Sequence, residues 1–207
     1  LLYGPPGCGK TSIAHYISEQ TGLPLVVAKL DGIVSSLLGS TAKNLRKIFS
    51  YASSIPCILF LDEFDAIAKA RDDSHELGEL KRVINSLLQN IDSLPSSTVL
   101  IAATNHPQLL DKAVWRRFTI KSEVNLPDEN NRITLIKLLL DGYNCSFLDD
   151  TSRLNAFSNL VSAMSPSDIS TLLTRQKVNC VINGSKDISY ENLIQAVYDY
   201  QGKDESM

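Results

Sequence analysis

Cysteine is scarce in this sequence, and the cysteines present are not paired. The chain has four, at Cys8, Cys57, Cys145 and Cys180, and no two of them form a C-x-x-C pair. Zinc sites and disulfide frameworks both need closely spaced or paired cysteines, so neither is expected. The scattered thiols fit a reducing compartment, and we therefore expect the protein to be cytoplasmic.

Long apolar runs and an excess of basic residues are also missing. No apolar run approaches the roughly 20 residues that a membrane-spanning helix needs, so no membrane span is expected. Lysine and arginine number 20 against 23 acidic residues, which gives a formal net charge of -3. Proteins that hold nucleic acid along their whole surface are usually basic, because lysine and arginine neutralise the phosphates. The acidic balance speaks against a nucleic-acid partner, although a local basic channel stays open as an alternative.

What the chain does have is enough apolar sequence for a core. It holds 207 residues, of which 43% are hydrophobic and 21% charged, and this suits a medium domain with a small appendage. Up to about residue 125, short apolar runs alternate with helix-period segments, as is typical of a parallel α/β sheet. The expected strands are Leu1–Tyr3, Leu25–Ala28, Cys57–Leu61, Thr98–Thr104 and Phe118–Val124. Because the first of these already resembles the end of a strand, we expect the chain to be a fragment that lacks its upstream part.

Beyond Pro127 the strand pattern stops and four helical stretches follow. Their apolar stripes lie within residues 133–140, 154–164, 169–173 and 193–198. Ser165, Pro166 and Asp168 form a good helix start, with a capping serine, proline at the first position and an acid in the first turn. We therefore predict an α/β domain over residues 1–126 and a small all-α domain over residues 127–207.

A glycine-rich segment near the start matches the phosphate-loop pattern G-x-x-x-x-G-K-[ST]; it reads Gly4-Pro5-Pro6-Gly7-Cys8-Gly9-Lys10-Thr11. It follows a predicted strand and opens a predicted helix, which Gly22 can end as a left-handed cap. Glycines let the loop turn its N–H groups toward phosphate oxygens, and the positive end of the helix adds to them. Lys10 would reach the outer phosphates, the Thr11 hydroxyl would ligate Mg²⁺, and Ser12 would complete the nucleotide site. The segment predicts binding of ATP with Mg²⁺; the alternative is a plain glycine-rich turn.

Two carboxylates follow the apolar strand that ends at Leu61. Charge at the end of a buried strand is costly unless something binds there. We expect Asp62 to hold Mg²⁺, largely through water, and Glu63 to polarise the attacking water. Taken alone, an acidic pair after a strand can also cap a helix, but the glycine loop upstream favours the catalytic interpretation.

Asn105, Arg116 and Arg117 complete the set of candidates. Asn105 follows the strand Thr98–Thr104, and ligands bind outside the carboxyl ends of parallel strands, so its side chain could orient water against the terminal phosphate. The alternative is that Asn105 starts a turn before Pro107. The two arginines could offer a guanidinium to charge developing on a phosphoryl group, including that of another subunit; the alternative is solvated surface charge.

In this order the motifs resemble those of the AAA ATPases, specifically the protein-remodelling branch that contains katanin, spastin, the proteasomal ATPases and bacterial sporulation-type relatives. The resemblance covers nearly the whole chain. Residues 2–7 are similar to the family's glycine loop, residues 61–67 to its second motif, residues 102–105 to its first sensor and residues 110–118 to its arginine-finger segment. The resemblance implies a P-loop NTPase fold with a helical lid. It also implies a ring, usually of six subunits, in which Arg116 and Arg117 reach the neighbour's nucleotide.

The same resemblance implies an ATPase that couples ATP turnover to remodelling or unfolding of protein substrates. The alternatives are a nucleotide-dependent regulatory switch and a nucleic-acid motor or loader on the same core. Many relatives carry an aromatic residue in the first pore loop where this chain has Leu37. We expect Leu37 to contact the protein substrate with a weaker grip than an aromatic ring, while burial of this leucine in the core is the alternative.

Overall fold

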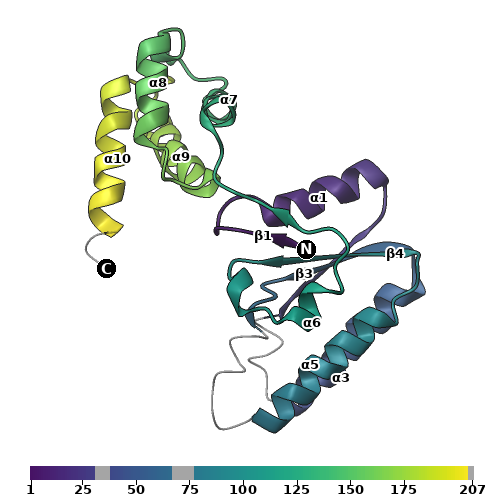
Figure 1. The fold of residues 1–207 in the computed structure, drawn as a ribbon. Coiled ribbons are helices and arrows are strands. Elements are labelled where there is room, and N and C mark those ends of the chain that lie inside the picture. The colour runs from purple at the N-terminus through teal and green to yellow at the C-terminus, as the bar shows by residue number, and fades with distance from the viewer. Residues whose placement is uncertain (31–37, 67–76, 205–207) are drawn as a thin grey trace. The chain divides into compact units, whose positions relative to one another are not determined.

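The structure is a computed structural model that describes residues 1–30, 38–66 and 77–204 (Figure 1). The chain divides into two compact units. The first consists of Leu1–Pro5 and Gly9–Val124, and the second of Pro6–Cys8 and Asn125–Met207. We keep the domain limits 1–126 and 127–207 as predictions. No helix among the described residues is long and apolar enough to cross a membrane.

A five-stranded parallel sheet in the order β2-β3-β4-β1-β5 forms the first unit, which confirms the predicted fold class. The strands are β1 (Leu2–Tyr3), β2 (Leu25–Lys29), β3 (Cys57–Asp62), β4 (Thr98–Thr104) and β5 (Ser122–Glu123). In the register, Leu61 lies beside Ala102, and Tyr3 lies beside Thr104. Because β3, β4 and β1 are neighbours that run in one direction, their carboxyl ends meet at one edge of the sheet.

Helices cover both faces of this sheet. Among the described residues they are α1 (Lys10–Thr21), α3 (Leu38–Ser54), α5 (Leu77–Asp92) and the short α6 (Lys112–Trp115), with a 3-10 turn, η1, at Pro107–Leu109. Figure 1 shows α1 on one face and α3 with α5 on the other. The first helix ends where predicted, because Gly22 adopts the left-handed conformation with φ of 68°.

The interior strand β3, which lies between β2 and β4, is apolar on both faces, as a strand covered by helices on both sides must be. Its side chains alternate, so Ile58 and Phe60 pack with Ala14 of α1. Leu59 and Leu61 belong to the larger cluster that α3 and α5 form on the opposite face. Asp62, the last residue of β3, therefore follows five fully buried residues at the carboxyl end of the strand.

The fifth strand is shorter than the sequence predicts. The prediction over Phe118–Val124 is wrong at its start, because β5 spans only Ser122–Glu123. Phe118 instead lies in a loop, where its ring meets that of Phe64 edge-on at a centroid distance of 6.0 Å. Its burial, with 4% of its surface exposed, explains why it looked like part of a core strand.

The second unit is all-helical, in agreement with the four predicted stretches. It contains α7 (Glu129–Leu139), α8 (Thr151–Leu160), α9 (Pro166–Ile182) and α10 (Tyr190–Asp204), with a 3-10 turn, η2, at Ser146–Leu148. Its core draws on all four helices; the fully buried members include Ile136, Leu140, Phe157, Val161, Ile169, Leu173, Leu193 and Val197. The predicted start of α9 is confirmed, because Ser165 and Asp168 form a reciprocal capping box.

Candidate active site

The glycine loop after β1 has a backbone that only glycine adopts easily. Gly4, Gly7 and Gly9 have φ values of 139°, 73° and 93°. A side chain at Gly4 would also collide with the backbone oxygen of Val124. The loop is therefore shaped by its glycines, and Gly7 lies exposed to solvent together with Pro5 and Pro6.

Lys10 is held against this loop. It is the first residue of α1, it is 7% exposed, and its Nζ donates to the carbonyl oxygens of Gly4 at 2.8 Å and Pro5 at 2.7 Å. The ammonium group is thereby kept at the loop that the sequence predicts to bind phosphates. Thr11 and Ser12, in the first turn of α1, are exposed to solvent.

The two predicted Mg²⁺ ligands lie together. The Thr11 hydroxyl donates to Oδ2 of Asp62 at 3.0 Å, although the two residues are 51 positions apart in the sequence. A hydroxyl and a carboxylate at a phosphate loop are oxygen donors of the kind that Mg²⁺ uses together with nucleotide phosphates. The residues present therefore fit the ion.

Glu63 lies next to this pair in a strained backbone conformation. With φ of 55°, it is the one residue other than glycine with a positive φ among those that the structure describes. Such a conformation costs on the order of 1–3 kcal/mol and persists only where the surroundings impose it. Here the Glu63 N–H donates to Oδ1 of Asp62 at 3.0 Å, and the next N–H, that of Phe64, donates to the Ala103 oxygen at 2.9 Å. The turn that carries Glu63 is thus fixed to β3 and β4.

Asp65 is a residue of the site to which the sequence analysis assigned no role. It is 4% exposed, and its Oδ1 accepts from the Thr104 hydroxyl at 2.9 Å and from the Asn105 N–H at 3.3 Å. The His106 N–H donates in turn to the Thr104 hydroxyl at 3.0 Å. Asp65 therefore fixes the chain just where Asn105 leaves β4. The signal that could have pointed to it was a third carboxylate placed between the apolar residues Phe64 and Ala66, shortly after the acidic pair.

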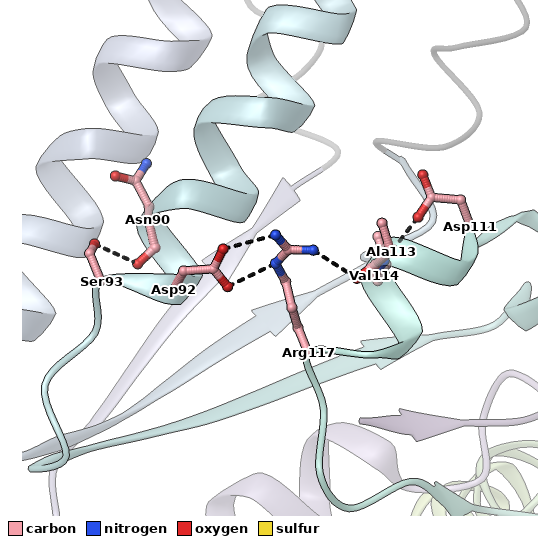
Figure 2. A network of polar contacts seen from close by, with 7 residues as sticks. All are labelled: Asn90, Asp92, Ser93, Asp111, Ala113, Val114 and Arg117. Atoms are coloured by element: carbon pink, nitrogen blue, oxygen red, sulfur yellow. Dashed lines mark hydrogen bonds and ion pairs between the residues drawn. The ribbon is translucent and has the colours of Figure 1, made fainter.

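The adjacent arginines differ in their surroundings, and Figure 2 shows those of Arg117. Arg117 donates from Nε and Nη2 to the two carboxylate oxygens of Asp92, at 2.9 and 2.8 Å, and from Nη1 to the Ala113 oxygen at 2.9 Å. The hydrogen bond to Asp92 raises the pKa of Arg117 above its ordinary value. Arg116 is exposed, and no residue in the described part of the chain bonds its guanidinium.

The structure thus brings Lys10, Thr11, Asp62, Glu63 and Asn105 to the carboxyl ends of the neighbouring strands β1, β3 and β4. It joins Arg117 to α5 instead. The predicted substrate contact, Leu37, lies outside the described residues.

Comparison with known proteins identifies the family. Residues 1–126 match the family model described as "ATPase family associated with various cellular activities (AAA)". The chain belongs to this family. The predicted family and fold class are thereby confirmed, as is the prediction of an ATP-hydrolysing enzyme, while the roles of the single residues stay predictions.

Individual relatives cover different parts of this AAA chain. It is 56% identical over 118 residues to an uncharacterized AAA family ATPase, y4kL, of Sinorhizobium fredii. The matched stretch covers 57% of this chain and 36% of that protein. It is 33% identical over 212 residues to a proteasome-activating nucleotidase of Methanococcus vannielii, which covers 99% of this chain and 51% of that protein. A putative 26S proteasome regulatory subunit homolog of Methanocaldococcus jannaschii is 36% identical over 141 residues, 67% of this chain and 38% of that protein. The chain therefore spans about half, or less, of these relatives.

Proposed function

We propose that this chain is the ATP-hydrolysing core of a ring, in which turnover of Mg²⁺-bound ATP drives the remodelling of protein substrates. The observation that carries the catalytic part is the convergence of Thr11 and Asp62, 3.0 Å apart, beside the strained Glu63. A glycine loop, an ion-binding pair and a base on one sheet edge suit phosphoryl transfer to water.

In the proposed site each residue has a distinct task. When bound, ATP with Mg²⁺ supplies the phosphoryl group and the positive charge that makes its phosphorus electrophilic. Thr11 and Asp62 would hold the ion, and Lys10 would exchange its loop carbonyls for the outer phosphates. Glu63 would accept a proton from the water that attacks the terminal phosphorus, while the bond to the bridging oxygen breaks and ADP leaves with that electron pair. Asn105 would orient the water.

Protein substrates are proposed from the relatives. A proteasome-activating nucleotidase matches 99% of this chain, including the helical unit, so the likeness is not confined to the nucleotide site. The AAA family also supports an oligomer, which we propose to be a six-membered ring with Arg116 at its subunit interfaces. The scattered cysteines support a place in the cytoplasm.

A stimulation assay on the full-length protein tests the substrate class. ATP turnover is measured alone, with an unfolded protein and with single-stranded DNA. We expect the unfolded protein to raise turnover and DNA to leave it unchanged. Stimulation by DNA alone would favour a nucleic-acid motor, and no response to either would favour a regulatory switch. Leu37→Ala should then remove the stimulation and leave basal turnover near that of the parent.

A further inference from the structure

Arg117 is bound within its own chain through every nitrogen of its guanidinium. Nε and Nη2 form a two-pronged contact with Asp92, and Nη1 reaches the Ala113 oxygen (Figure 2). Paired, charge-assisted hydrogen bonds of this kind have the most favourable geometry for an arginine and a carboxylate. Arg117 is 27% exposed and Asp92 53% exposed, so the pair lies at the surface and its strength comes from the geometry of the contact.

The contact joins two segments that the chain separates by 25 residues. Asp92 is the last residue of α5, whereas Ala113 belongs to α6, so the guanidinium links the end of one helix to the backbone of the other. The four residues of α6 are too few to form a stable helix alone. At the start of α6, Asp111 caps the helix by accepting from the Val114 N–H. Just beyond its end, Arg117 fixes the segment through its hydrogen bonds to Asp92.

Arg116 follows directly on α6 and has the opposite character. Its side chain is exposed, and none of the described residues bonds it. For Arg117 to swing out to a phosphate of another subunit, its two charge-assisted hydrogen bonds to Asp92 would have to break. Arg116 would break none.

We propose that the two arginines divide the task between them. Arg117 is a positioning residue that Asp92 locks inside its own subunit, and this lock holds α6 so that Arg116 is the arginine presented to the neighbouring nucleotide. The proposal rests on the proposed ring ATPase, and it removes one of the two predicted fingers from direct contact with ATP.

Four variants of the full-length protein test the division: Arg116→Ala, Arg117→Ala, Asp92→Asn and the double variant Asp92→Asn/Arg117→Ala. Arg116→Ala should lower kcat by about 10³-fold or more, as loss of an arginine finger does. Asp92→Asn and Arg117→Ala should each lower kcat by about tenfold to a hundredfold, because a misplaced group loses that much, with ATP affinity unchanged. The double variant should be no worse than Arg117→Ala, since both changes remove the same contact.

Asp149→Asn is the matched control. Asp149 is an exposed aspartate in the helical unit, and no residue of the described chain bonds its side chain. Asp149→Asn changes the net charge by the same amount as Asp92→Asn without removing a contact. It should leave kcat unchanged.

Mixing locates the defect. Rings that combine Asp92→Asn subunits with Glu63→Gln subunits should regain turnover, because the first kind keeps its base and receives an intact arginine from the second. General damage to the fold of Asp92→Asn would also damage its own site, and no turnover would return.

The proposal is overturned if Asp92→Asn hydrolyses ATP at the parent rate or faster while Arg117→Ala is as slow as Arg116→Ala, because Arg117 would then be a finger itself. The proposal is overturned as well if ATP turnover does not return when the two kinds of subunit are mixed. If Arg116→Ala hydrolysed ATP at the parent rate, the result would contradict more than the division of tasks between the two arginines. It would also contradict the proposed ring in which an arginine acts between subunits.

Discussion

The two units of this chain use their buried polar groups differently. Among the described residues of the α/β unit, the buried polar ones are Lys10, Asp65 and Thr104, and all three lie at or beside the carboxyl ends of strands. In the helical unit they are Arg132, Ser158 and Ser165, which join or cap helices. Buried polar groups that meet at a sheet edge can serve chemistry, whereas those between helices fix the packing.

Backbone strain follows the same division. In the α/β unit, Glu63 has a positive φ, a conformation that its side chain makes unfavourable. In the described part of the helical unit, only glycines have a positive φ, as Gly142 and Gly184 do. Glycine adopts that conformation readily. The α/β unit thus carries backbone strain at the sheet edge that holds the proposed catalytic residues, and the described part of the helical unit carries none outside glycine. We therefore expect substitutions at that edge to affect activity and substitutions in the helical unit to affect stability.

The largest effect is expected at the proposed catalytic residues. Glu63→Gln should keep ATP binding and lower turnover by about 10²–10⁴-fold, the range for loss of a general base. Lys10→Ala should instead lose binding, because it removes the charge directed at the phosphates. Steady-state hydrolysis and equilibrium nucleotide binding separate the two. Turnover of Glu63→Gln close to that of the parent would remove the assigned base.

The next effect tests the packing role of the helical unit. Phe157 is fully buried, and its ring lies 5.9 Å from that of Phe147. Phe157→Ala should lower the free energy of unfolding by about 3–5 kcal/mol, measured by urea denaturation. Leu138→Ala on the same unit is the control: this leucine is 71% exposed, so its loss should change the free energy by less than about 0.5 kcal/mol.

The comparison would fail if Phe157→Ala abolished ATP turnover while leaving the unfolding curve unchanged. The helical unit would then contribute to chemistry through that position, and not through packing alone.

How much the sequence predicts depends on the distance between partners. β4 has the predicted bounds, Thr98–Thr104, and Gly22 and Ser165 cap helices as predicted, because alternation and capping involve residues a few positions apart. Phe118 misled the strand prediction, because burial in a loop and burial in a strand leave the same apolar signal.

The site divides in the same way. The glycine loop is a local motif, and the approach of Thr11 to Asp62 follows from the rule that parallel strands end at one edge. The roles of Asp65 and Asp92 were not predicted, because their partners lie 39 and 25 residues away in the sequence and no local spacing encodes those contacts. Their carboxylates acquire a role only once the sheet order and the end of α5 are known.

A smaller effect is expected at Asp65, which sharpens the first comparison. Asp65→Asn keeps one oxygen but loses the charge that holds the Thr104 hydroxyl and the Asn105 N–H. Turnover should fall by about tenfold, equivalent to about 1.4 kcal/mol and close to the lower limit of what a hydrogen bond to a charged group contributes, while ATP binding persists. Thr104→Val is the companion variant, and it should show the same change in kcat to a lesser degree. A loss of ATP affinity without a change in kcat would contradict a role through Asn105.

The smallest effect lies in the helical unit, at the start of α9. Asp168 accepts through Oδ2 from the Ser165 hydroxyl at 2.6 Å and N–H at 3.2 Å, and through Oδ1 from the Tyr200 hydroxyl at 2.8 Å. Burial raises the pKa of Asp168, but these hydrogen bonds outweigh it, so the pKa lies below its usual value. The ionised carboxylate therefore stabilises the folded state fully above its unfolded pKa of about 3.9, and this contribution is lost as the pH falls through the lower folded value.

Asp168→Asn should accordingly destabilise the chain at pH 6 by about 1 kcal/mol, the size of a helix cap, and the gap to the parent should close as the pH falls toward 3 and below. Urea unfolding of both proteins at several pH values measures it. Tyr200→Phe removes one donor and should give a smaller gap with the same pH dependence. Asp149→Asn should give none, because the Asp149 side chain is exposed and no residue of the described chain bonds it. A gap for Asp168→Asn that is equal at pH 6 and pH 3 would show that the amide fails for steric reasons and that ionisation of Asp168 contributes nothing.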